Sequence, residues 1–244
     1  MGSTFSSVPP NNNKNGVLSF STAKEAVPGA AAAQQPATSC ACMPTALHTA
    51  PLSPTMNVIS TSLEGVVILE PRVFEDARGY FFESFSQREF DEKVRPIRFV
   101  QDNESRSTRG VMRGLHYQRM PHTQSKLVRC TQGCVVDVAV DIRHGSPTFG
   151  QHVAVELSAE NHRQLFIPRG FAHGFAVLSD IAVFEYKCDN FYAPESDAGI
   201  SLLDERLDID WRMPVADALL SEKDLHHPLF DEAPADFHID DRLY

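Results

Sequence analysis

Several features that define other classes of protein are missing from this chain of 244 residues. No apolar run approaches the roughly 18 residues that a membrane-crossing helix needs, so we expect no transmembrane segment. The five cysteines are odd in number and form no Cys-x-x-Cys pair, which favours reduced thiols over a disulfide framework or a zinc site. The formal charge of −10 argues against a nucleic-acid surface, which needs a dominant basic field. The sequence therefore predicts a cytoplasmic protein that binds neither nucleic acid nor a membrane.

The first 55 residues differ in composition from the rest of the chain. They contain seven of the 16 prolines, runs of asparagine and alanine, and no arginine, the first arginine being Arg72. Such a segment buries too little apolar surface to offset the entropy lost on ordering. It also lacks the basic start and long apolar stretch of a signal peptide and the arginines of a transit peptide. We therefore expect residues 1–55 to be a disordered extension, and residues 56–244 to form one domain with an acidic C-terminal tail.

From residue 56 onwards, the chain reads as short strands separated by turn residues at intervals of roughly ten residues. Residues 135–143 alternate most clearly, with valines and an isoleucine facing one way and Asp137 and Asp141 facing the other. That alternation is typical of a strand with one buried and one solvated face. Repeated short strands of this kind predict an all-β sandwich or barrel of the jelly-roll type.

Little helix is expected in this domain. Residues 87–94 predict a short helix, which Pro96 ends. Near the C-terminus, Ser221 and Asp224 resemble the two ends of a capping box that begins another helix. Neither a glycine-rich phosphate loop nor an internal repeat is present.

One stretch, residues 109–118, concentrates arginines, a histidine and a tyrosine around two glycines, which permit turns or a close approach of backbones. A strand-like segment follows, in which Lys126 shares a face with Val128. A lysine beside a valine on one strand face is unusual for a solvated strand. From the residues alone, His116 is also compatible with a half-buried structural histidine, and Lys126 with an edge residue whose charged end reaches solvent. Arg113 beside them favours the other interpretation, a local basic pocket in an otherwise acidic chain.

The order of this and other motifs resembles the dTDP-4-dehydrorhamnose 3,5-epimerase family. The resemblance covers residues 57 to about 228, with motifs at 76–84, 101–105, 113–118, 137–143, 168–175, 186–187, 192–195 and 208–211. It implies a cupin-type double-stranded β-helix that forms a homodimer and needs no cofactor. It also implies an isomerase that converts dTDP-4-dehydro-6-deoxy-D-glucose to dTDP-4-dehydro-L-rhamnose, in dTDP-L-rhamnose biosynthesis.

This reaction inverts C3 and C5, and both carbons flank the C4 ketone. Removing either proton therefore gives a stabilised enolate. The enzyme needs a base on one face of the sugar, an acid on the other and a cation near the carbonyl oxygen.

The resemblance also implies a role for each matching residue. His116 corresponds to the base and Asp224 to its orienting carboxylate. Lys126 would lie near the enolate oxygen, and Tyr186 would be the acid on the opposite face. Arg113 would hold the diphosphate, and Arg78 and Glu83 would reach the nucleotide across the dimer. The remaining binding residues would contact the sugar or line the pocket. The complete set of expected substrate-binding residues is Arg78, Glu83, Gln101, Asn103, Arg113, His173 and Tyr192, and no metal ligand is expected.

Some of these residues have simpler interpretations from the sequence alone. An acid at the position of Asp224 is common at helix starts, and Glu83 could be a paired charge on an edge strand. His173 follows a turn that many cupins share, where a metal ligand or a core histidine also occurs. The remaining histidines of interest, His122, His226 and His227, are expected to have no specific role.

Three other functions are compatible with a cupin-like pattern. A metal-dependent cupin needs two or three histidines and a carboxylate on one metal, but Gln118 stands where a second ligand would sit. A sugar-nucleotide binding protein without activity would not need the candidate base and acid, which are both present. An epimerase that inverts only one of C3 and C5, in an antibiotic-sugar pathway, would use the same residues, so the sequence leaves that alternative open.

Overall fold

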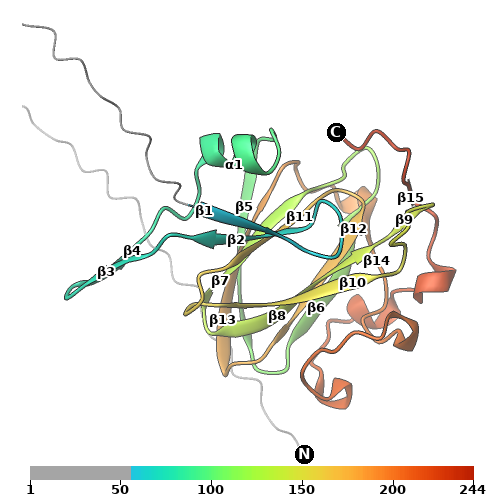
Figure 1. Ribbon diagram of the computed structural model, residues 1–244. Coiled ribbons are helices and arrows are strands. Elements are labelled where there is room, and N and C mark those ends of the chain that lie inside the picture. Colours follow the sequence, from blue (N-terminus) through green and yellow to red (C-terminus); the bar gives the residue numbers. More distant parts are fainter. Residues whose placement is uncertain (1–55) are drawn as a thin grey trace, which may run out of the picture. The chain divides into compact units, whose positions relative to one another are not determined.

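The structure is a computed structural model, and it describes residues 56–244, so the expectation for residues 1–55 lies outside it. Its body is a sandwich of two antiparallel sheets (Figure 1). One sheet has the strand order β1-β2-β11-β7-β13-β5 and the other β10-β8-β12-β6-β14. The predicted all-β, cupin-type jelly roll is confirmed.

The strands of the six-stranded sheet are β1 (Met56–Ser60), β2 (Val67–Pro71), β5 (Gln101–Thr108), β7 (Lys126–Gln132), β11 (Gln164–Ile167) and β13 (Ile181–Cys188). Those of the five-stranded sheet are β6 (Met112–Gln118), β8 (Cys134–Asp141), β10 (His152–Ser158), β12 (Phe171–Val177) and β14 (Asp197–Gly199).

The interior between the sheets is apolar at one end and polar at the other. Val128 of β7, Phe184 of β13 and Phe175 of β12 belong to one buried cluster, which therefore joins the two sheets. Side chains alternate along a strand with a period of two. Lys126 and Tyr186, two residues away from Val128 and Phe184, consequently face the same interior.

The outer face of the five-stranded sheet is covered by the segment that follows β14. Val136 and Val138 of β8 pack there in a buried cluster that includes Trp211. Both faces of β8 are therefore buried, and the solvated face predicted for Asp137 and Asp141 is wrong, because both are 0% exposed. The strand's own pattern gives no sign that a later segment covers its apolar face and turns its polar face inward.

The predicted helix is present as α1 (Gln87–Lys93), in which the Ser86 side chain accepts a hydrogen bond from the Glu89 amide. Phe90 of α1 is buried against Phe166 on the outer face of the six-stranded sheet. Near the C-terminus, only single 3-10 turns form. They are Pro194–Ser196, Glu205–Leu207, Val215–Asp217, Asp224–His226 and Phe230–Glu232.

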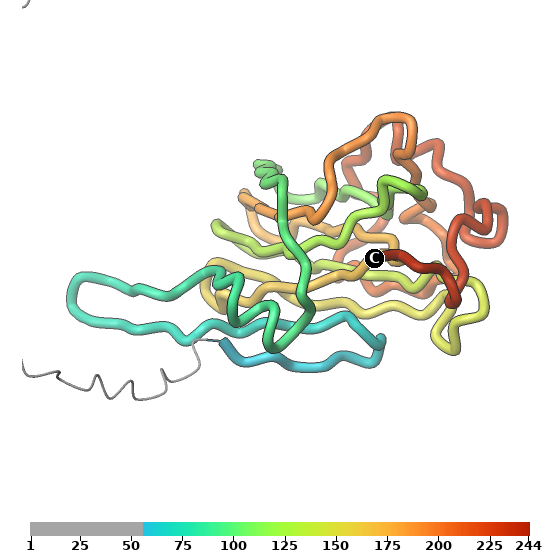
Figure 2. The backbone as a smooth tube through the Cα atoms, turned by 90° about the horizontal axis from the view of Figure 1, so that it is seen from above, coloured from blue at the N-terminus to red at the C-terminus, as the bar shows by residue number. Residues whose placement is uncertain are grey.

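A two-stranded hairpin, β3 (Phe74–Asp76) and β4 (Gly79–Phe81), projects away from the sandwich (Figures 1 and 2). Tyr80 and Phe81 on this hairpin are 61% and 71% exposed. Exposed aromatic residues on a projecting arm are typical of a surface that contacts a partner. Within residues 56–244, no helix is long and apolar enough to cross a membrane.

The last residues return to the sandwich. β15 (Phe237–His238) pairs with β9 (Arg143–His144), and Phe237 is buried. The Tyr117 hydroxyl donates a hydrogen bond to Asp236 (2.8 Å), and the hydroxyls of Tyr244 and Ser125 lie 2.7 Å apart. The acidic tail therefore packs as part of the fold.

Candidate active site

A cavity of about 450 Å³ opens between the two sheets, a size that suits a small ligand. Its lining includes Arg113 and His116 of β6, Lys126 of β7, His173 of β12, Tyr186 of β13, and Asp224 from the 3-10 turn. A neighbouring hollow shares His116, Lys126 and Tyr186, so the two spaces meet at these side chains. The structure thus brings together all four residues expected to be catalytic.

His116 and Asp224 form the most tightly connected pair in the cavity. His116 Nε2 lies 2.6 Å from Asp224 Oδ1, and the Ser221 hydroxyl donates a hydrogen bond to Asp224 Oδ2 (2.8 Å). Burial opposes ionisation of Asp224, but the hydrogen bonds from His116 and Ser221 outweigh it and hold the pKa of the carboxyl below its ordinary value. Because a carboxylate only accepts, His116 Nε2 carries the proton of this bond and Nδ1 remains available as a base.

The alternative interpretation of Asp224 as a helix cap accounts for only part of this geometry. Ser221 Oγ accepts a hydrogen bond from the Asp224 amide (3.2 Å), as an N-terminal cap does. The Asp224 carboxylate, however, is directed to His116. The side chain is 3% exposed, so it is held in a fixed orientation behind the histidine.

Lys126 approaches the cavity from the opposite sheet. Its Nζ lies 3.4 Å from the backbone carbonyl oxygen of His116, and the ammonium has two further N–H donors. Burial lowers the pKa of Lys126, while Cys188, Asp137 and Asp197 act in the opposite direction. A partly desolvated cation in this position favours a negative charge on a bound ligand.

Tyr186 and Arg113 also line the wall of the cavity. Burial raises the pKa of the Tyr186 hydroxyl, which therefore keeps its proton at neutral pH, although the charge of Arg113 opposes the shift in part. Arg113 is exposed and donates hydrogen bonds to the Ser107 hydroxyl at 3.2 and 3.3 Å. Its planar guanidinium suits a phosphate group.

His173 lies beside His116, its partner in the pairing of β12 with β6. Its Nε2 is 2.9 Å from Asp137 Oδ2, and both residues are buried. Burial lowers the pKa of His173 and raises the pKa of Asp137, so the neutral forms are favoured. His173 thus forms part of the cavity wall, with one ring nitrogen already engaged by a carboxyl group.

The close backbone approach predicted in the stretch 109–118 occurs at Gly114. A Cβ at this position would lie 2.5 Å from the Gly174 Cα of the neighbouring strand. Gly114 also has a φ of +123°, which residues with side chains rarely adopt. These two glycines let β6 and β12 approach each other just before His116.

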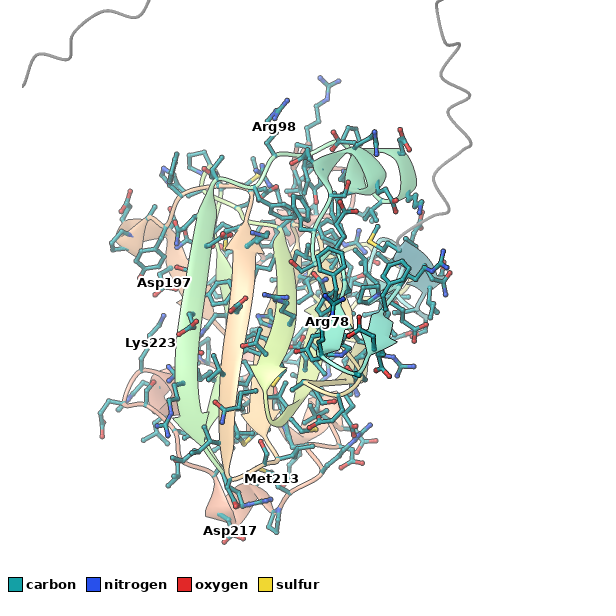
Figure 3. All side chains as sticks on the ribbon, turned by 90° about the vertical axis from the view of Figure 1, so that its left-hand side faces the viewer. Arg78, Arg98, Asp197, Met213, Asp217 and Lys223 are labelled. Carbon is teal, nitrogen blue, oxygen red and sulfur yellow. The ribbon has the colours of Figure 1, made fainter. Side chains whose placement is uncertain are left out.

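Three of the expected binding residues line the neighbouring hollow. Gln101 donates a hydrogen bond to Asn103 (2.9 Å) and accepts one from the Tyr192 amide (3.1 Å). An ion pair between Lys223 and Asp197 stands at the rim, where the two side chains lie close together (Figure 3).

Arg78 and Glu83 line neither of these spaces. Arg78 is on the projecting hairpin, where its side chain is 90% exposed and binds Asp76 (2.6 Å) (Figure 3). Glu83 follows the hairpin and lines a small hollow beside α1. Within one chain, the structure therefore does not bring these two residues to the site.

Comparison with known proteins agrees with this geometry. Residues 60–232 match the family model described as dTDP-4-dehydrorhamnose 3,5-epimerase. Over 170 residues, the chain is 59% identical to the dTDP-4-dehydrorhamnose 3,5-epimerase of Escherichia coli, a match covering 69% of this chain and 91% of that protein. This chain belongs to the dTDP-4-dehydrorhamnose 3,5-epimerase family.

Two further relatives differ in whether their names specify epimerisation at C3 and C5 or at C3 alone. The crystal structure of dTDP-6-deoxy-D-glucose-3,5-epimerase from Legionella pneumophila, in complex with dTDP-4-keto-L-rhamnose, matches with a TM-score of 0.71 and 52% identity, covering 74% of this chain and 95% of that one. The dTDP-4-dehydrorhamnose 3-epimerase of Streptomyces niveus is 38% identical over 179 residues, or 73% of this chain and 86% of that protein.

In this member of the epimerase family, His227 lies near the His116–Asp224 pair, the candidate dyad, although the sequence led us to expect no role for it. His227 Nε2 lies 3.8 Å from Asp224 Oδ1, and the His227 ring meets the His116 ring edge-to-face with 5.4 Å between centroids. The available sequence signal was spacing, because residues three apart in a 3-10 turn lie on the same side.

Proposed function

We propose that this protein epimerises dTDP-4-dehydro-6-deoxy-D-glucose at C3 and C5, giving dTDP-4-dehydro-L-rhamnose for dTDP-L-rhamnose biosynthesis. The single observation that carries the proposal is the convergence of His116, Lys126 and Tyr186, from two facing sheets, on one cavity. The family membership and the 59% identity to the Escherichia coli enzyme support the same activity.

The geometry suggests a role for each of these side chains. His116 Nδ1 removes the proton from the carbon next to the ketone, and Asp224 stabilises the imidazolium that forms. Lys126 offsets the charge that develops on the enolate oxygen. Tyr186, whose raised pKa keeps it protonated, returns a proton to the opposite face. Each step moves one proton, so the chemistry requires no cofactor.

The substrate's nucleotide part needs contacts beyond this cavity. We propose that Arg113 binds the diphosphate and that Gln101, Asn103, His173 and Tyr192 contact the sugar or line the pocket. We further propose a homodimer in which the hairpin carries Arg78 and Glu83 to the partner's site. The exposure of Tyr80, Phe81 and Arg78 on a projecting arm supports this arrangement.

Inversion of a single centre is the second candidate function. The same base, acid and cation would perform it, and the Streptomyces niveus 3-epimerase is a relative. Its 38% identity against 59% for the Escherichia coli 3,5-epimerase favours inversion of both centres. We also propose a cytoplasmic location, which the free thiols of Cys130, Cys134 and Cys188 support.

The test is product analysis. Purified protein is incubated with dTDP-4-dehydro-6-deoxy-D-glucose in D2O, and the product is examined by proton NMR. We expect deuterium at both C3 and C5 with both configurations inverted. Inversion at one carbon supports the second candidate, and a substrate that is bound but unchanged supports a binding protein.

A further inference from the structure

His227 is unusual among the histidines near the cavity because no group among the described residues forms a hydrogen bond with its Nε2. Its side chain is 10% exposed, and Nε2 is sealed from solvent without a hydrogen-bond partner among the described residues. The ring lies directly against Gly199, where a Cβ would approach Nε2 to 2.5 Å. Gly199 is the strand partner of His116. The fold therefore leaves room for an imidazole beside the His116–Asp224 pair and directs its unpartnered nitrogen toward that pair.

Three potential metal ligands consequently meet at one point. Nitrogen atoms of His116 and His227 and an oxygen of Asp224 all lie within 4.8 Å of one another. The individual separations are 2.6 Å for His116 Nε2 to Asp224 Oδ1 and 3.8 Å for His227 Nε2 to Asp224 Oδ1. In a tetrahedral zinc site with bonds of 2.0–2.2 Å, ligand atoms are about 3.3–3.6 Å apart. Shifts of roughly 1 Å, within the reach of small side-chain rotations, would produce that geometry.

The surroundings also suit a bound cation. The groups that face the His227 ring are the imidazole of His116, the carboxylates of Asp224 and Asp197, and the ammonium of Lys223. The Ser221 hydroxyl holds the second oxygen of Asp224 (2.8 Å), as groups behind a metal ligand commonly do.

We propose that His116, Asp224 and His227 form a binding site for a divalent transition-metal ion such as Zn²⁺, and that the bound ion inhibits the enzyme. Inhibition rests on the proposed function, whereas binding does not. A neutral imidazole carries one proton, so coordination through His116 Nε2 moves that proton to Nδ1. Nδ1 is the nitrogen that acts as the base, and it loses its free lone pair. The ion also occupies the carboxylate that stabilises the imidazolium.

The binding test uses the full chain, stripped with EDTA and desalted. Zn²⁺ is titrated by calorimetry and by competition with a chromophoric chelator. We expect His227→Gln to weaken the site at least about tenfold, because loss of even an outer partner of a metal costs 10–100-fold. His226→Gln is the matched control, since that neighbouring histidine is exposed and faces the Glu222 carbonyl (2.6 Å). Asp224→Asn, read by binding alone, is the second variant and should weaken the site similarly.

The thiols and the histidines outside residues 226 and 227 are also potential Zn²⁺ ligands, but every variant keeps them. The difference between variants therefore reports this site. If His227→Gln and Asp224→Asn both bind Zn²⁺ as the wild type does, the proposal is wrong.

The activity test compares each protein with its own metal-free rate. Zn²⁺ should stop both inversion and deuterium incorporation in the wild type, leave dTDP binding intact, and be reversed by EDTA. His227→Gln should require at least about tenfold more Zn²⁺ for the same inhibition. Equal sensitivity of both proteins, or inhibition through loss of dTDP binding, would overturn the inhibitory role. Zn²⁺ binding that depends on His227 in a protein without turnover would instead retain the site and reject the proposed function.

Discussion

Lys126 offers the most direct test of the proposed chemistry, through the substitution Lys126→Met. Methionine keeps most of the length and the apolar stem of lysine but removes the charge. At a hydrogen-bond distance of about 3 Å, a unit charge pair contributes roughly 5 kcal/mol in a protein-like dielectric and about 1 kcal/mol in water. The position of Lys126 in a partly open cavity places the effect between these limits, at about 3 kcal/mol, which corresponds to a decrease in kcat of about two orders of magnitude.

The assay is steady-state kinetics combined with deuterium incorporation. We expect kcat and exchange at C3 and C5 to fall together, because both require the enolate, while KM changes much less. Lys187→Met is the matched control. Lys187 lies next to Tyr186 on β13 but faces the other side of the sheet and pairs with Asp102 (3.0 Å), so its loss should leave kcat within about twofold, as for other exposed pairs.

Removal of the Lys126 charge should also affect stability. Burial lowers the pKa of this lysine, so the fold disfavours its charged form, and Lys126→Met should unfold at a higher temperature than the wild type. A variant with normal kcat and raised KM would show that Lys126 binds substrate without stabilising the enolate, and the proposed mechanism would be wrong.

Four further predictions follow from the site and the domain boundaries. Tyr186→Phe keeps the base and the cation, so in D2O it should place deuterium in substrate of unchanged configuration, seen by mass spectrometry and NMR. Complete absence of exchange would refute the two-face assignment. Asp224 has a pKa below the ordinary 3.8 in the folded protein, so the stability that it contributes is present above about pH 4 and decreases as the pH falls through the folded value. Asp224→Asn should therefore unfold more easily at neutral pH, with a smaller loss of stability below about pH 4, in denaturant titrations at several pH values. Prolonged EDTA treatment should not lower turnover, and a divalent ion that rescues a chelated enzyme would contradict this. A chain that begins at Met56 should turn over like the full chain, and insoluble or inactive protein would disprove it.

The sequence predicted well those elements whose position depends on the spacing of neighbouring residues. The strand expected at residues 135–143 occurs as β8 (Cys134–Asp141), and α1 ends one residue before its expected end. The period of two also indicated that Lys126 shares a face with Val128, which is the interior face. These features depend on local spacing, so one segment of sequence contains the necessary information.

Other features depend on distant parts of the chain, and the sequence could not reveal them. Asp137 is buried because the C-terminal segment covers the opposite face of its strand. The expected binding residue Arg78 lies on a projecting hairpin, so its side chain lines neither of the two spaces of its own chain. The spacing of His227 from Asp224 was visible in the sequence, but the packing of its ring against Gly199, 28 positions earlier, was not.

The pairing of His116 with Asp224 has a consequence for folding, because the two residues are 108 positions apart. His116 belongs to the five-stranded sheet, whereas Asp224 arrives with the segment that covers that sheet's outer face. Closing so long a loop has an entropic cost, which the apolar contacts of this segment, including Trp211, must offset. During refolding, the sheets can therefore form while the histidine still lacks its carboxylate. Recovery of activity would then report docking of the C-terminal segment, later than the recovery of β structure.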